Sequence, residues 1–113
     1  MHELSLCESV LEIIERQAQI DRFKRVKTVV LEIGVLSCVE PESMQFCFDS
    51  VMQHTIASGA HLDIVTLPGL GFCRVCQKQQ PVEQRYDPCP ECGRLAIDLI
   101  QGTEMRVKEL EVE

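Results

Sequence analysis

The sequence is poor in aromatic residues and in positive charge. Its 113 residues include no tryptophan, four phenylalanines and one tyrosine. It has 11 lysines and arginines and 18 aspartates and glutamates, which gives a formal net charge of −7. Few aromatic rings mean few platforms on which nucleic-acid bases can stack, and an acidic balance disfavours binding to a phosphate backbone. A short basic cluster occurs within residues 22–27, but it falls in a connector between expected elements. We therefore expect no nucleic-acid partner.

Long apolar runs and targeting signals are also missing. No run approaches the roughly 20 apolar residues that a membrane-spanning helix needs. The N-terminal sequence MHELSLCESV carries acids at positions 3 and 8 and lacks the cationic start of a secretory signal. The seven cysteines, an odd number without an export signal, indicate a reducing compartment. These absences predict a cytoplasmic protein without a membrane partner.

Motifs for common enzymatic chemistry are not found either. The chain has no glycine-rich phosphate-binding loop, and nothing in it resembles a nucleophile with its neighbouring base. The length allows one ordinary domain, or a small domain that carries a still smaller cross-linked one. The sequence therefore predicts a protein that is not an enzyme.

Four of the cysteines form two CxxC pairs. Cys73 and Cys76 are separated from Cys89 and Cys92 by a twelve-residue insert. Four thiolates at this spacing can close a tetrahedral shell around one metal ion, which predicts a zinc site. Turn-forming residues flank both pairs, namely Gly69 and Gly71 before the first and Pro88, Pro90 and Gly93 around the second. Because a segment of about thirty residues cannot bury a large core, a metal cross-link would stabilise it.

The two CxxC pairs could instead form two disulfides, but the rest of the chain argues against it. Two further alternatives stay open. Four thiolates can also hold iron, as in a redox protein of the rubredoxin type. The other three cysteines are Cys7, Cys38 and Cys47, of which the first and last fall on apolar helical faces. We interpret those two as small buried hydrophobic residues, with a second metal site formed by all three as the alternative.

Hydrophobic periodicity predicts an α+β fold. Helices are expected over residues 4–20 and from Pro41 onward, and strands over residues 28–36, 61–67, 95–100 and 104–112. We expect two helices on a three-stranded sheet, with a zinc ribbon inserted before the last strand. Residues 1–68 plus 103–113 would form one domain and residues 69–102 the ribbon.

Two of the expected strands have further detail. In the first, the residues expected to face the core are Val29, Leu31, Ile33 and Val35. In the last, the apolar residues change parity, which predicts a β-bulge near Lys108 and Glu109.

The first three residues form a second candidate metal site. The amine of Met1 and the backbone nitrogen and imidazole of His2 can bind one ion in fused chelate rings. A deprotonated amide is a strong-field ligand that suits a square-planar ion such as Ni(II) or Cu(II), and Glu3 can complete the plane. The alternative is an ordinary exposed N-terminus in which Glu3 complements the dipole of the first helix.

Four segments together carry a resemblance to a known family. They are the opening MHELSL, the segment VVLEIGVLSCVEPES, the C-x2-C-x12-C-x2-C insert and the closing strand. Over essentially the whole chain they resemble the HypA/HybF family, nickel-insertion accessory proteins for the maturation of [NiFe]-hydrogenases. The resemblance implies an N-terminal nickel-binding domain and a separate zinc ribbon.

The resemblance also implies particular residues. The family's nickel motif corresponds to His2 and Glu3, with the amine of Met1 as a further donor, and its zinc ligands correspond to the cysteine quartet. An acidic residue implicated in some members corresponds to Glu40, whose alternative role is to place negative charge at a helix N-terminus.

Some members have histidines beside the CxxC pairs. Gln77 and Gly93 occupy those positions here, so we expect no exchange of histidine into the zinc site. The histidines His54 and His61 are expected to be surface or structural residues rather than ligands.

We therefore predict a nickel metallochaperone. It would carry Ni(II) as cargo, keep Zn(II) as a structural ion, and deliver nickel to the [NiFe]-hydrogenase large-subunit precursor. The resemblance implies a HypB-type nickel GTPase as a partner, and a hinge at residues 68–71 allows a homo-oligomer by exchange of a strand or ribbon. The alternative is a zinc-ribbon module that binds proteins or nucleic acid without nickel.

Overall fold

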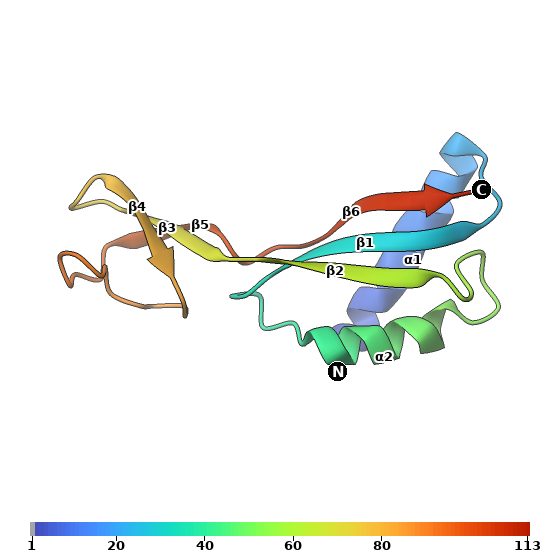
Figure 1. Cartoon of the computed structure of the whole chain (residues 1–113), viewed down its shortest axis with the longest axis horizontal. Helices are drawn as coiled ribbons and strands as arrows, with labels where there is room; N and C mark the ends of the chain where they lie inside the picture. The colour runs from blue at the N-terminus through green and yellow to red at the C-terminus, as the bar shows by residue number, and fades with distance from the viewer. Residues whose placement is uncertain (1) are drawn as a thin grey trace. The chain divides into compact units, whose positions relative to one another are not determined.

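The computed structural model describes residues 2–113, and Met1 lies outside them. The elements in chain order are α1 (His2–Asp21), β1 (Val26–Gly34), α2 (Pro41–Met52), β2 (His61–Leu67), β3 (Gly69–Cys73), β4 (Lys78–Val82), β5 (Ile97–Gln101) and β6 (Met105–Val112). They form two three-stranded sheets with the strand orders β2-β1-β6 and β4-β3-β5 (Figure 1). The predicted α+β architecture, with a ribbon inserted before the last strand, is confirmed.

The chain divides into two compact units. Unit one consists of residues up to Leu31, Val39–Val65 and Arg106–Glu113, and unit two of Glu32–Cys38 and Thr66–Met105. These bounds differ from the predicted 1–68 plus 103–113 and 69–102, because the ends of β1 and β2 and the turn after β1 belong to the ribbon unit. The functions that we assigned to the two parts remain predictions.

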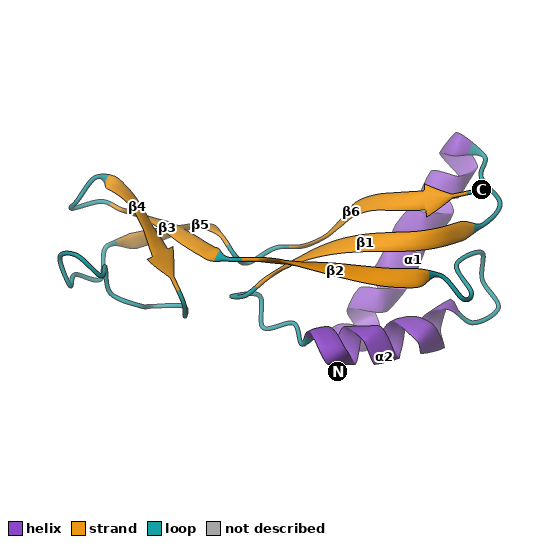
Figure 2. Ribbon diagram, in the orientation of Figure 1, coloured by secondary structure: helices purple, strands orange, loops and turns teal. Residues whose placement is uncertain are grey.

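Unit one contains both helices and most of the sheet β2-β1-β6 (Figure 2). Each helix buries one apolar stripe at helical spacing, which is Cys7, Val10 and Ile14 in α1 and Met44, Phe48 and Met52 in α2. Val29 and Leu31 of β1 are fully buried as well. The predicted inward faces of the helices and of this part of β1 are therefore confirmed.

The ends of α1 and β1 differ slightly from the predicted ones. The helix covers residues 2–21 rather than 4–20, and Arg22 ends it in the left-handed region at φ 59°, with its N–H donated to the carbonyl of Ala18 at 2.8 Å. The strand covers residues 26–34 rather than 28–36. Because a turn closed by Ser37 N–H on the carbonyl of Gly34 follows it, Val35 leaves the strand and is 50% exposed. The prediction that Val35 faces the core was wrong.

Unit two is built on β3, which pairs antiparallel with both β4 and β5. The strands β3 and β4 were not among the predicted elements, and β5 begins at Ile97 rather than residue 95. Gly34 and Gly102 approach closely in this unit, since a Cβ built on Gly34 would lie 2.0 Å from the carbonyl oxygen of Gly102. The glycines therefore permit a backbone contact that any larger residue would block.

The last strand shows the expected change of parity. Val107 and Leu110 of β6 are half-buried although an odd number of steps separates them, and both Lys108 and Glu109 between them are exposed. The bulge near Lys108 and Glu109 remains a prediction.

Candidate metal centres

Two similar turns present the four cysteines of unit two. In the first, Gln77 donates its N–H to the carbonyl of Cys73 at 2.8 Å with φ 60°, and in the second Gly93 donates to Cys89 at 2.8 Å with φ 73°. The residue after each CxxC pair is thus left-handed, which turns the chain sharply and points both thiols of a pair to one side. β3 carries Cys73 at its end, so the first turn extends directly from the sheet.

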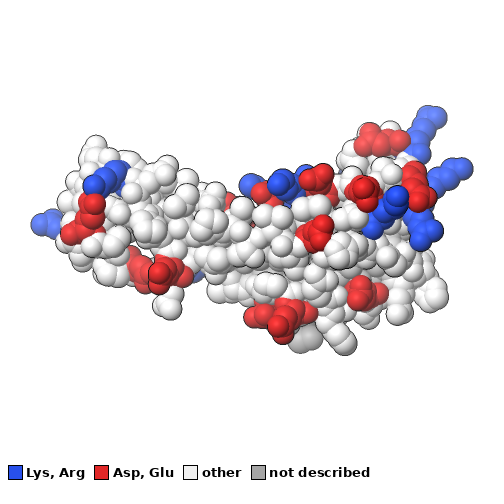
Figure 3. Space-filling view, viewed as in Figure 1, with Lys and Arg blue, Asp and Glu red and all other residues white. Residues whose placement is uncertain are grey.

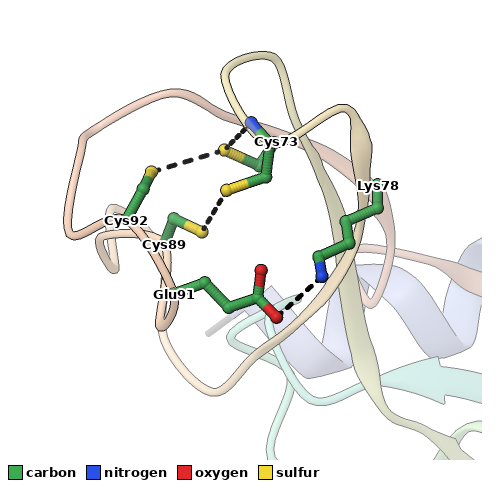
Figure 4. Close-up of polar contacts among 6 residues, drawn as sticks. Cys73, Lys78, Cys89, Glu91 and Cys92 are labelled. Atoms are coloured by element: carbon green, nitrogen blue, oxygen red, sulfur yellow. Dashed lines mark hydrogen bonds and ion pairs between the residues drawn. The ribbon is translucent and has the colours of Figure 1, made fainter.

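The sulfur atoms are spaced as zinc ligands are. The Sγ atoms of Cys73 and Cys92 lie 3.8 Å apart and those of Cys76 and Cys89 lie 3.9 Å apart (Figure 4), and all four lie within 4.8 Å of one another. A tetrahedron with Zn–S bonds of about 2.3 Å has edges of about 3.8 Å. These separations are far longer than a disulfide bond. The quartet therefore fits one tetrahedral zinc ion with no open position.

Backbone N–H groups stabilise negative charge on two of the cysteine sulfurs. The N–H of Cys76 donates to Sγ of Cys73 at 3.4 Å. The N–H groups of Cys92 and Glu91 lower the pKa of Cys89 to about 7, since they stabilise the thiolate. Burial, followed by the neighbouring thiols, raises the pKa of Cys76 to about 12. Bringing four thiolates together thus requires a cation, which zinc supplies.

An ion pair joins the second turn to β4. Lys78 Nζ lies 2.8 Å from Glu91 Oε1, beside the quartet (Figure 4). The hydrogen bond with Glu91 raises the pKa of Lys78, and Lys78 in turn lowers the pKa of Glu91. The ammonium group also lies near the thiols of Cys76 and Cys89, so it partly offsets the negative charge of a four-thiolate site. The sequence analysis missed this pair, because opposite charges 13 residues apart carry no local signal.

The N-terminal candidate site lies in unit one. His2 and Glu3 occupy the first turn of α1, where His2 is exposed. Glu3 Oε2 accepts a hydrogen bond from the N–H of Glu40 at 3.1 Å. This bond lowers the pKa of Glu3 below its ordinary value of 4.5. Of the predicted residues, Glu3 thus contacts the backbone of Glu40 and His2 is the chain neighbour of Glu3, whereas Met1 lies outside the described residues.

Glu40 is also the N-cap of α2. Its carbonyl accepts a hydrogen bond from the N–H of Met44 at 3.0 Å, and its own side chain makes no capping hydrogen bond. The carboxylate is exposed. It is therefore not committed to closing the helix.

The remaining cysteines do not form a second cluster. Cys7 is buried, with Sγ 3.7 Å from the carbonyl oxygen of Met44, and burial raises its pKa to about 11. Cys38 is exposed and Cys47 is half-buried. Within residues 2–113 the Cys73–Cys92 quartet is the one group of three or more histidines, cysteines or carboxylates whose ligand atoms converge. Cys7 is thus a small buried hydrophobic residue, as predicted.

The other histidines lie on the surface, and no bilayer-spanning helix is found. His54 and His61 are exposed, and His61 Nε2 lies 2.6 Å from Asp63 Oδ1. Neither helix of residues 2–113 has the length and apolarity that a bilayer crossing requires.

The fold and the quartet define a small two-unit α+β protein with a zinc-ribbon unit. The family model described as "Hydrogenase/urease nickel incorporation, metallochaperone, hypA" matches residues 1–112. The chain belongs to this HypA family of nickel metallochaperones for hydrogenase maturation.

Individual relatives agree with this assignment. The chain is 56% identical to a hydrogenase maturation factor HypA from Rhodopseudomonas palustris (strain BisA53) and 50% identical to one from Azotobacter chroococcum mcd 1, in each case over the full length of both chains. The solution structure of the Ni metallochaperone HypA from Helicobacter pylori is 25% identical with a TM-score of 0.73, over 97% of this chain and 96% of that one. A second HypA solution structure is 27% identical with a TM-score of 0.76, over 100% and 97%.

Proposed function

We propose that this chain holds Ni(II) at its N-terminus and passes the ion to the [NiFe]-hydrogenase large-subunit precursor. The donors would be the amine of Met1, the amide and imidazole of His2, and the carboxylate or amide of Glu3. Glu40 is a further carboxylate donor. Membership of the HypA family supports a nickel cargo, and the composition of the N-terminus supports its position.

The position of His2 and Glu3 at the start of α1 carries this proposal. The first four N–H groups of a helix have no acceptor within that helix. Deprotonating the amides of His2 and Glu3 for nickel binding therefore breaks no helical hydrogen bond. The positive end of the helix dipole would also favour the resulting anionic nitrogen.

A second observation supports the carboxylate donors. The hydrogen bond between Glu40 N–H and Glu3 Oε2 brings the start of α2 to the start of α1. The backbone of Glu40 thus lies at the Glu3 carboxylate, and the charges of Glu3 and Glu40 would offset the repulsion between a cation and two helix N-termini. Because the imidazole donor His2 is exposed, the ion could exchange ligands with an acceptor protein.

The transfer would break no covalent bond, so the chain would act as a carrier rather than an enzyme. A nickel GTPase of the HypB type would be its partner in the cytoplasm. The zinc ion would be held by Cys73, Cys76, Cys89 and Cys92 and would stabilise unit two. Metal analysis separates this assignment from iron, since a four-thiolate iron site absorbs visible light and a zinc site does not.

Nickel titration of untagged protein tests the N-terminal site. We expect His2→Ala to weaken Ni(II) binding by about a hundredfold and to abolish the square-planar absorption band. His61→Ala is the matched control, because His61 is also exposed and lies in the same unit. If His2→Ala kept tight square-planar nickel, or if His61→Ala lost it, the proposed site would be wrong. No residue can precede Met1 in this test, since an extension would remove the terminal amine.

A further inference from the structure

The helices of unit one carry all of the protein's excess negative charge. Together with the Glu40 cap, α1 and α2 hold eight carboxylates and one cation, Arg16, so that ten charges of each sign remain in the rest of the chain. The carboxylates are those of Glu3, Glu8, Glu12, Glu15, Asp21, Glu40, Glu42 and Asp49. In Figure 3 the charged atoms seen over α2 are red, and the blue atoms of unit one gather elsewhere.

The outer face of α2 also exposes a large aromatic side chain. Phe46 is 78% exposed, whereas Phe48, two residues later, is 1% exposed and belongs to the core. Glu42 and Asp49 stand one turn before and one turn after Phe46 on the same face, at i−4 and i+3, and both are exposed. From Glu40 to Asp49 α2 and its cap contain no lysine or arginine.

We propose that this face, consisting of Glu42, Phe46 and Asp49, docks a protein partner that presents lysine or arginine side chains around an apolar pocket. An aromatic side chain framed by opposite charge is a typical binding hot spot, since the ring fills the pocket and the charges orient the partner. A cation placed over the ring would add a cation–π contact. A second copy of the chain does not fit face to face, because two identical acidic faces repel each other.

The face is close to the proposed nickel site. Phe46 follows Glu40 by six residues, which is about 9 Å along a helix axis. Glu40 N–H in turn contacts the carboxylate of Glu3. A partner bound at Phe46 would therefore lie less than two helical turns from the residue that contacts Glu3. The two proteins used as probes below are chosen because of the proposed function. The assignment of the docking face does not depend on that function.

Binding of the zinc-loaded, untagged chain to two purified probes tests the proposal. The probes are the nickel GTPase and the hydrogenase large-subunit precursor, each measured by biolayer interferometry at low and at physiological ionic strength. For the probe that binds, we expect Phe46→Ala to weaken binding by about tenfold or more. The double variant E42K/D49K should also weaken binding and should remove most of its salt dependence.

Two control variants match these changes. Tyr86→Ala removes the 90% exposed aromatic ring of unit two, and E83K/E109K makes the same change of net charge at exposed sites outside α2. Both should bind as the wild type does. The proposal is overturned if neither probe binds the wild type, if Phe46→Ala binds normally, or if that variant changes only the self-association of the chain.

Nickel stoichiometry, measured on every variant, keeps the two proposals separate. Phe46→Ala should retain nickel while it loses the partner. Loss of nickel binding in Phe46→Ala would show that the face belongs to the metal site and would overturn its docking role. If His2→Ala instead kept tight nickel binding, the proposed nickel site would be wrong, and the binding measurements on the Phe46 face would still test the docking proposal.

Discussion

A single carboxylate connects the two helices of unit one at their N-termini. Glu3 accepts the N–H of Glu40, a residue 37 positions away, and this bond lowers the pKa of Glu3. The carboxylate thus stabilises the contact between the N-termini of α1 and α2 even without a metal ion. A nickel ion that recruits Glu3 would compete with this hydrogen bond, so holding and releasing the ion would alter the contact between the helix ends.

The titration of Glu3 should be visible at the amide of Glu40. Because the folded pKa is lowered, the contact contributes stability above the ordinary value of 4.5 and loses it as the pH falls through the lower, folded value. In a Glu40→Gln variant, in which only Glu3 titrates beside this amide, the NMR shift of the residue 40 N–H should therefore move with a midpoint below 4.5. The double variant E3Q/E40Q should show no such step. A midpoint at or above the ordinary value would contradict the hydrogen bond.

Among the elements, β1 ends at a glycine whose backbone lies close to another backbone segment. Gly34 lies against Gly102, and the N–H of Leu36 donates to the carbonyl of Gly102 at 2.7 Å. Leu36 is itself buried, and its side chain lies beside Gly69 and Gly102. The end of β1 and the segment after β5 thus contact each other directly through their backbones.

Gly34→Ala should strongly destabilise unit two. The added methyl would lie 2.0 Å from a backbone oxygen that cannot rotate away, so we expect a loss of about 3 kcal/mol in the free energy of unfolding. The control is Gly59→Ala, which meets nothing within 4 Å but has φ +76°, and which should cost about 1 kcal/mol. Urea unfolding of the zinc-loaded proteins, followed by circular dichroism, measures both. Equal losses of unfolding free energy in the two variants would show that the close approach of Gly34 to Gly102 does not exclude a larger side chain at position 34.

At the scale of the whole molecule, each unit holds its own candidate metal centre. The cysteine quartet lies entirely within unit two, and His2, Glu3 and Glu40 lie entirely within unit one. Each unit also has buried residues of its own, such as Phe48 in unit one and Cys73 in unit two. The zinc ion is therefore expected to stabilise the ribbon without forming part of the nickel site.

Cys73→Ala should release zinc and leave nickel binding in place. Removing one thiolate opens the tetrahedral shell, and unit two has few buried apolar residues that could replace the cross-link. Zinc content by mass spectrometry should fall towards zero, while the nickel titration keeps its stoichiometry. Cys38→Ser, at an exposed cysteine outside the quartet, is the control and should keep both metals. Joint loss of zinc and nickel in Cys73→Ala would contradict separate centres.

Much of this organisation was predictable from local spacing. The stripe Met44, Phe48 and Met52 repeats at helical intervals, and the two CxxC pairs carry their geometry in four-residue turns. The error at Val35 arose because the alternation continues past Gly34, whereas a turn ends the strand there. The strands β3 and β4 were not predicted, because their glycine, glutamine and proline residues have little strand propensity.

The sequence by itself determined the metal-binding quartet, the helices and the candidate nickel chelate, since each depends on residues that are neighbours in the chain. Only the tertiary structure decided that Glu40 meets Glu3, that Lys78 pairs with Glu91 beside the thiols, and that Phe46 is exposed while Phe48 is buried. Contacts between distant residues follow from how whole elements pack, and periodicity within one element does not encode that packing. The surest local signal therefore identified the zinc site, and long-range packing set the surroundings of the proposed nickel site.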